Sequence, residues 1–117
     1  MFKNTSQPED RATANFIVDR CAERLERPVD NDLDRQFIAK LDRLIHSLES
    51  YVDRGARICM ISALRVKGEL GIKIGDFSEA VTALDQAQKM AERDSSDTAH
   101  KARIASKLAC ARKALGK

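Results

Sequence analysis

Apolar residues recur every three or four positions over almost the whole chain, and this spacing constrains the fold more than any other feature. Such spacing places the apolar side chains on one face of an α-helix. Five Gly and two Pro among 117 residues are too few for the many turns of a multi-stranded β fold. We therefore expect an all-α fold, and the length fits a single domain.

Helix-capping signals and chain breaks divide the chain into five segments. Ser6 followed by Glu9 predicts a capping box at the start of the first helix, and Asp76 with Glu79 predicts another further along. Gly55 is a plausible stop between the second and third segments, although one continuous helix is also possible there. The expected architecture is a bundle of about five antiparallel helices over residues 7–27, 31–54, 56–74, 77–93 and 97–115, in one domain spanning residues 1–117 with residues 1–5 flexible.

The second segment carries two apolar rows where a helix at the edge of a bundle needs only one. The rows are Leu33, Phe37, Leu41, Leu44, Leu48 and Tyr51, and beside them Ile38, Ile45 and Val52. We expect Leu48, Tyr51 and Val52 to remain partly exposed, and a contiguous apolar patch marks an interface. The sequence therefore predicts a homodimer at micromolar concentration, and a purely structural homo-oligomer is one of the possible functions.

One stretch resembles a known family, the tetratricopeptide repeat, a helix–turn–helix of about 34 residues. The residues that carry the resemblance, all within residues 63–92, are Leu64, Gly68, Gly75, Phe77, Ala80, Leu84 and Ala87. The sequence departs from the family at Gly71, where a tyrosine is usual, and at Glu92, where a proline is usual. The resemblance implies a hairpin over residues 61–93 with Gly68 packed against Ala80, completed by the other segments because one repeat cannot bury its own faces.

The same resemblance implies a partner-binding face on the first helix of the hairpin. Its residues would be Ser62, Arg65, Glu69, Ile72 and Lys73. A charged ridge beside Ile72 can bind an acidic peptide or a C-terminal carboxylate. An ion-pair ladder at i,i+4 spacing, exposed to solvent, explains the same charges equally well. The leading hypothesis is a small non-catalytic protein–protein interaction module that acts as an adaptor, a chaperone-like protein or a regulatory subunit.

The charges are distributed unevenly along the chain. Residues 1–97 hold 15 basic and 18 acidic side chains, whereas residues 98–117 hold six basic side chains and no acidic one. The basic residues of the last helix include Lys101, Arg103, Lys107, Arg112 and Lys113. Because they flank an apolar seam on both sides, we interpret residues 97–115 as a docked capping helix. The alternative is a nucleic-acid-associated regulator that uses this helix as a basic face.

The residue inventory for chemistry is small, and we predict no catalytic site, metal or cofactor. Cys21, Cys59 and Cys110 form no Cys-x-x-Cys pair, so we expect buried, reduced thiols in a cytoplasmic protein. Asp42, His46 and Glu49 share a helix face that we expect to be solvated, and we also expect His100 to be exposed. The longest apolar run, residues 58–64, is far shorter than a membrane span, and the first residues contain no apolar signal region, so we expect neither membrane insertion nor secretion.

Overall fold

Five α-helices and one short 3₁₀-helix make up the computed structural model, which describes residues 4–116. The helices are α1 (Pro8–Glu23), η1 (Arg24–Glu26), α2 (Asn31–Leu48), α3 (Arg54–Lys73), α4 (Phe77–Asp94) and α5 (Thr98–Ala114). Over the described residues the only extended pairing is an isolated bridge between Asn4 and Tyr51. The prediction of an all-α helical bundle is therefore confirmed.

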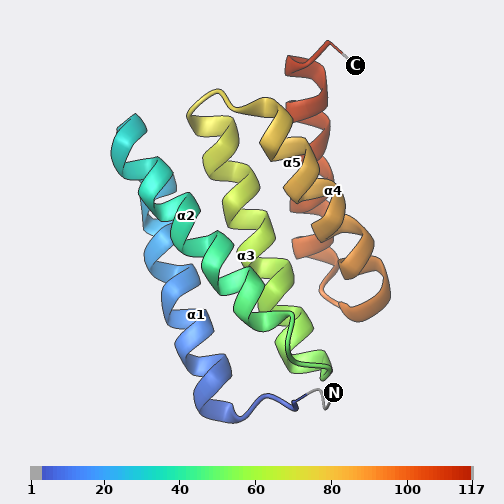
Figure 1. Ribbon diagram of the computed structural model, residues 1–117. Coiled ribbons are helices and arrows are strands. Elements are labelled where there is room, and N and C mark those ends of the chain that lie inside the picture. The colour runs from blue at the N-terminus through green and yellow to red at the C-terminus, as the bar shows by residue number, and fades with distance from the viewer. Residues whose placement is uncertain (1–3, 117) are drawn as a thin grey trace.

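Helix α3 lies at the centre of the bundle, with α1 and α2 on one side and α4 and α5 on the other (Figure 1). It contacts all four other α-helices, and it supplies about a third of the buried hydrophobic core residues, more than any other helix. Helix α3 packs against both α1 and α2, and α5 packs in the same way against both α3 and α4. Helices α3 and α5 thus each pack against both of the helices that precede them.

Aspartate side chains cap four of the five helices. Asp30 accepts a hydrogen bond from the Leu33 N–H at 3.1 Å, and Asp76 accepts one from the Glu79 N–H at 3.3 Å, which confirms both predicted helix starts. Helix α1 begins one residue later than predicted. Its N-cap is Gln7, whose N–H donates to Asp10 Oδ2 at 2.8 Å, because the Ser6 side chain is used elsewhere.

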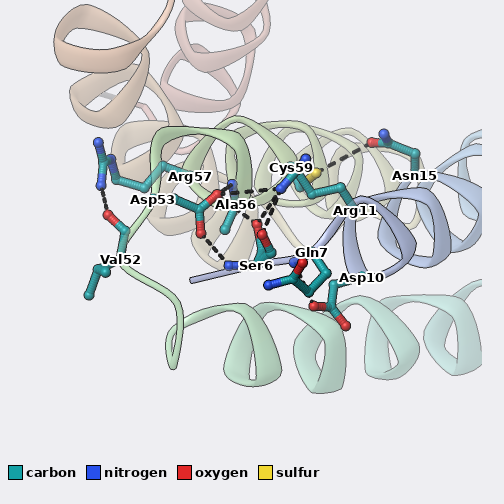
Figure 2. Close-up of polar contacts among 10 residues, drawn as sticks. All are labelled: Ser6, Gln7, Asp10, Arg11, Asn15, Val52, Asp53, Ala56, Arg57 and Cys59. Atoms are coloured by element: carbon teal, nitrogen blue, oxygen red, sulfur yellow. Dashed lines mark hydrogen bonds and ion pairs between the residues drawn. The ribbon is translucent and has the colours of Figure 1, made fainter. Parts of the chain in front are cut away.

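Ser6 connects the N-terminal segment to the start of α3 (Figure 2). Its N–H and its hydroxyl donate to the two carboxylate oxygens of Asp53 at 2.7 and 2.6 Å, and Arg11 donates to the Ser6 hydroxyl at 2.9 Å. Asp53 also caps α3 by accepting from the Ala56 N–H at 3.1 Å. These hydrogen bonds lower the pKa of Asp53 to about 2, so the cap is anionic at neutral pH.

The predicted end of the second helix is wrong by six residues, because α2 ends at Leu48 rather than at residue 54. The chain then pairs with the N-terminal segment: the Asn4 N–H donates to the Ser50 carbonyl at 3.2 Å, and the Val52 N–H donates to the Asn4 carbonyl at 3.1 Å. These bonds replace helical ones, so α2 and α3 are separate helices. Gly55 is the second residue of α3 and not a stop. Asn4, expected to be flexible, forms both bonds, and residues 1–3 lie outside the described part.

Helices α3 and α4 form the expected antiparallel hairpin, but its register differs from the prediction. A Cβ on Gly71 would lie 3.2 Å from the Cβ of Ala80, whereas a Cβ on Gly68 would lie 2.4 Å from Leu84 Cγ. Gly68 therefore packs against Leu84, and Ala80 packs one turn closer to the connecting loop. The cause is the short turn at Gly75 (φ 81°), which starts α4 at Phe77 and brings Ala80 opposite Gly71.

Two expectations about exposure are also corrected. Leu48 is buried, contrary to the expectation, whereas Tyr51 is half-buried and Val52 is 43% exposed, so the patch expected at the end of the second segment is smaller than predicted. Cys21 and Cys59 are buried as expected, but Cys110 is exposed. Position 110 faces away from α3 and α4, since Ile104, Leu108 and Ala111 form the buried stripe of α5.

Candidate functional site

A groove of about 420 Å³ lies over the C-terminal half of α3, with the α1–η1 junction on one side and α5 on the other. It is lined by all four residues predicted to bind a partner: Arg65, Glu69, Ile72 and Lys73. Arg103 and Lys107 of the basic helix line it as well, and Ala22, Leu25 and Glu26 complete it. The groove thus joins the predicted partner-binding residues with two of the five residues of the alternative basic face. Ser62 does not line this groove.

Glu69 lines the groove and is 5% exposed. Arg65, one turn earlier on α3, forms an ion pair with it. Arg103 of α5 donates to the Oε1 atom of Glu69 through Nε at 3.1 Å and Nη2 at 3.0 Å, and the Lys107 ammonium lies 3.9 Å from that oxygen. One buried carboxylate therefore holds three cations from two helices. The Arg65–Glu69 pair has the i,i+4 geometry of a ladder, but the ladder does not continue to Lys73.

Lys73 is bound instead to Asp34, a fully buried residue of α2. The Lys73 ammonium lies 3.0 Å from Asp34 Oδ2, and Arg24 Nε donates to Asp34 Oδ1 at 2.8 Å. Burial alone would raise the pKa of Asp34, but the hydrogen bonds from Arg24, the Asp30 N–H and Lys73 outweigh it and lower that pKa. This cluster joins η1, α2 and α3 at one end of the groove.

Sequence reasoning missed the role of Asp34 because it read this residue as part of an acidic capping run. The signal that could have revealed this role is the position of Asp34 within the apolar pattern of α2. Asp34 lies three, four and seven residues before Phe37, Ile38 and Leu41, which places it on the apolar stripe of α2. A carboxylate on such a stripe is buried and needs cationic partners.

His100 was expected to be exposed, and this expectation is wrong. The imidazole is partly buried at the start of α5, where Arg65 Nε donates to its Nε2 atom at 2.9 Å. Burial and the neighbouring Arg65 charge lower the pKa of His100. The neutral imidazole therefore accepts from Arg65, which holds the guanidinium between His100 and Glu69.

The groove combines an excess of positive charge with an apolar wall. Its lining contains four cations, Arg65, Lys73, Arg103 and Lys107, against two carboxylates, Glu26 and Glu69. The Arg103 and Lys107 side chains are 51% and 45% exposed, whereas those of Arg65 and Lys73 are 14% and 11% exposed. The apolar side chains of the lining are Ala22, Leu25 and Ile72. This arrangement attracts a carboxylate and offers a surface on which a neighbouring side chain can pack.

The remaining basic residues of α5 lie outside the groove. Arg112 Nη2 lies 3.2 Å from Asp85 on α4, and Lys101 lines a hollow shared with Glu92 of α4. Lys113 is exposed near the end of the helix. The five residues of the proposed basic face are thus divided between two sides of α5 and do not form one continuous surface.

The three residues of this helix face that the sequence singled out, Asp42, His46 and Glu49, have separate partners and do not form one site. Asp42 Oδ1 lies 2.6 Å from the Lys67 ammonium, which also contacts Glu79, and His46 lies 3.8 Å from Glu49. Within residues 4–116, no three His, Cys, Asp or Glu side chains are grouped so that they could hold a metal ion. Over the same residues, no helix combines the length and the apolar character needed to cross a membrane.

Comparison with known proteins adds no assignment: no family model, curated protein or solved structure matches this chain.

Proposed function

We propose that this protein is a non-catalytic, cytoplasmic interaction module whose groove binds an acidic segment of another protein. One observation carries the proposal: three cations converge on the single carboxylate of Glu69, and two of them, Arg103 and Lys107, are half exposed at the mouth of the groove. The tetratricopeptide-like hairpin remains a prediction, and the proposal does not depend on it. The three unpaired cysteine thiols fit a reducing compartment.

Donor groups that Glu69 does not use are available to an incoming carboxylate. Arg103 directs Nε and Nη2 at Glu69, which leaves its Nη1 N–H groups free of that contact. Lys107 lies 3.9 Å from Glu69, beyond hydrogen-bond distance, so its ammonium retains its donors. A carboxylate in the groove would receive charge-assisted hydrogen bonds from both side chains.

Arg65 and Lys73 support this site from below. Each is largely buried and is paired with a buried carboxylate, Arg65 with Glu69 and Lys73 with Asp34. Substituting Arg65 or Lys73 would therefore disturb folding as well as binding, because it would leave a buried charge without its partner. A binding test is cleaner at Arg103 and Lys107.

The test uses a fluorescein-labelled peptide of alternating Glu and Leu, titrated with the protein and followed by fluorescence anisotropy. In the groove variant, Arg103→Gln and Lys107→Gln are combined. The matched control combines Lys101→Gln and Lys113→Gln, which removes the same charge from the same helix outside the groove. We expect the groove variant to bind about tenfold more weakly, equivalent to about 1.4 kcal/mol, and the control to bind like the wild type.

Two outcomes would contradict the proposal. Equal weakening in the groove variant and the control would mean that the peptide responds only to the net charge of α5. Tight, salt-dependent binding of duplex DNA that both variants weaken equally would instead favour the nucleic-acid alternative. Circular dichroism and thermal unfolding of the wild type and both variants are the folding control. If they are unchanged, the differences in anisotropy arise from binding and not from loss of structure.

A further inference from the structure

A second concave surface lies between α1 and α2, on residues that the groove does not use. Two hollows of about 520 and 250 Å³ follow one another along this crevice and share Ile17 and Lys40. Their lining on α1 runs from Asp10 to Cys21, roughly 16 Å along the axis at a rise of about 1.5 Å per residue. The crevice is therefore long enough for roughly three turns of a helix.

Apolar side chains line the crevice and remain accessible. Phe16 is 63% exposed, the most exposed large hydrophobic residue of the described chain. The partly buried Ile17, Phe37, Leu44 and Tyr51 surround the same two hollows. Isolated exposed apolar residues are ordinary, but several of them along one crevice mark an interaction surface.

Cations lie along this apolar lining. The Arg20 guanidinium lies 5.9 Å from the Phe16 ring centroid, the Lys40 ammonium lies 5.0 Å from that of Phe37, and Arg43 lines the larger hollow. Arg20 contacts Glu23 at 3.9 Å, whereas no ion pair within residues 4–116 engages Lys40 or Arg43. Asp10 is the only carboxylate of the lining.

The packing of the bundle indicates what shape fits the crevice. On the inner side of the same helix pair, α3 packs against both α1 and α2, and α5 packs against both α3 and α4. A helix laid along the outer side of α1 and α2 would continue this pattern. The side chains of such a helix at i, i+3, i+4 and i+7 would contact the apolar lining, and its flanks would face the cations.

We propose that the crevice between α1 and α2 binds an acidic amphipathic helix of another protein. Charge complementarity identifies this occupant: the apolar stripe of the helix packs on Phe16, Ile17 and Phe37, and its Glu or Asp residues pair with Lys40 and Arg43. A symmetric contact with a second copy of the chain does not fit, because it would place Lys40 and Arg43 of one copy against the same cations of the other. The inference does not rest on the peptide groove.

The experiment uses two labelled helical peptides of Leu and Ala with either Glu or Lys at every polar position. Anisotropy titrations compare wild type with Phe16→Ser, and with Lys40→Gln combined with Arg43→Gln. Val29→Ser is the matched apolar control, since Val29 is 58% exposed and lies outside the crevice. The groove variant, Arg103→Gln with Lys107→Gln, controls for binding at the other site.

We expect the Glu peptide to bind wild type and the Lys peptide not to bind. Phe16→Ser, and separately the Lys40 and Arg43 variant, should weaken binding about tenfold, with Val29→Ser and the groove variant unchanged. Equal binding of both peptides, or loss in the groove variant but not in the crevice variants, would overturn the proposal. So would a dimer of this chain that Phe16→Ser dissociates, because the occupant would then be a second copy.

Discussion

At the scale of single residues, the buried carboxylate of Asp34 has the largest predicted effect on stability. It is fully buried and pairs with Arg24 and Lys73, whose side chains are only 14% and 11% exposed. We expect Asp34→Asn to lower the free energy of unfolding by about 3 kcal/mol at neutral pH, because both cations lose their counter-charge in a poorly solvated site. Urea unfolding followed by circular dichroism measures the change.

The same substitution makes a prediction about pH. The pKa of Asp34 is lowered in the folded protein, so its contribution is complete above the unfolded value of 3.8 and is lost as the pH falls through the lower folded value. The stability difference between wild type and Asp34→Asn should therefore be constant from pH 7 to about pH 5 and shrink in more acidic solution. Asp32→Asn, an exposed neighbour on the same helix, is the control. A difference that persists unchanged at pH 2 would show that the Asp34 charge contributes nothing.

At the scale of helices, the contact between α3 and α4 depends on Gly68. Replacing Gly with Ala inside a helix normally stabilises it by about 1 kcal/mol. Here the added Cβ would lie 2.4 Å from the branched Cγ of Leu84, a fully buried side chain that would have to shift. We expect overpacking to prevail, so that Gly68→Ala lowers the free energy of unfolding by about 1–2 kcal/mol.

A double-mutant cycle with Leu84→Ala tests this contact by urea unfolding. Leu84→Ala alone destabilises by creating a cavity, but it also removes the atoms that the new methyl group would strike. In the Leu84→Ala background, Gly68→Ala should therefore be neutral or stabilising. Additive losses would mean that the cost arises elsewhere in α3.

The helices themselves were largely predictable from local signals, and the exceptions are instructive. Asp30 and Asp76 followed by apolar spacing located two helix starts within a residue. The end of α2 was missed because Tyr51 and Val52 continue its apolar rows, so the local pattern does not stop. Pairing with Asn4, 46 residues earlier than Ser50, ends the helix, and no local pattern contains this contact.

At the scale of the whole molecule, the resemblance to the tetratricopeptide repeat named four of the nine residues that line the candidate groove. Arg65, Glu69, Ile72 and Lys73 lie on one side of a helix, so their proximity follows from the 3.6-residue period alone. Spacing within α5 cannot show that Arg103 and Lys107 lie across from Glu69, because this depends on how α5 docks on α3. For the same reason the pairing of Lys73 with Asp34, 39 residues away, required the structure.

The state of association is a property of the whole surface, and the structure changes the expectation drawn from the sequence. The homodimer was predicted from Leu48, Tyr51 and Val52, but Leu48 is buried and only Val52 is well exposed. Phe16, the most exposed large hydrophobic side chain within residues 4–116, lies instead in a crevice flanked by Arg20 and Lys40, where two copies would repel each other.

We therefore expect a monomer of 13.0 kDa at micromolar concentration. Light scattering coupled to size exclusion measures the mass, and the comparison of low with high salt is the informative control. If like charges keep the copies apart, added salt screens them, and weak self-association should appear at high salt only. A mass near twice the monomer at low salt would restore the homodimer. The dimer interface would then lie at a surface where charges of opposite sign face each other. The Phe16 crevice, whose charged lining residues are mainly cations, could not be the centre of such an interface.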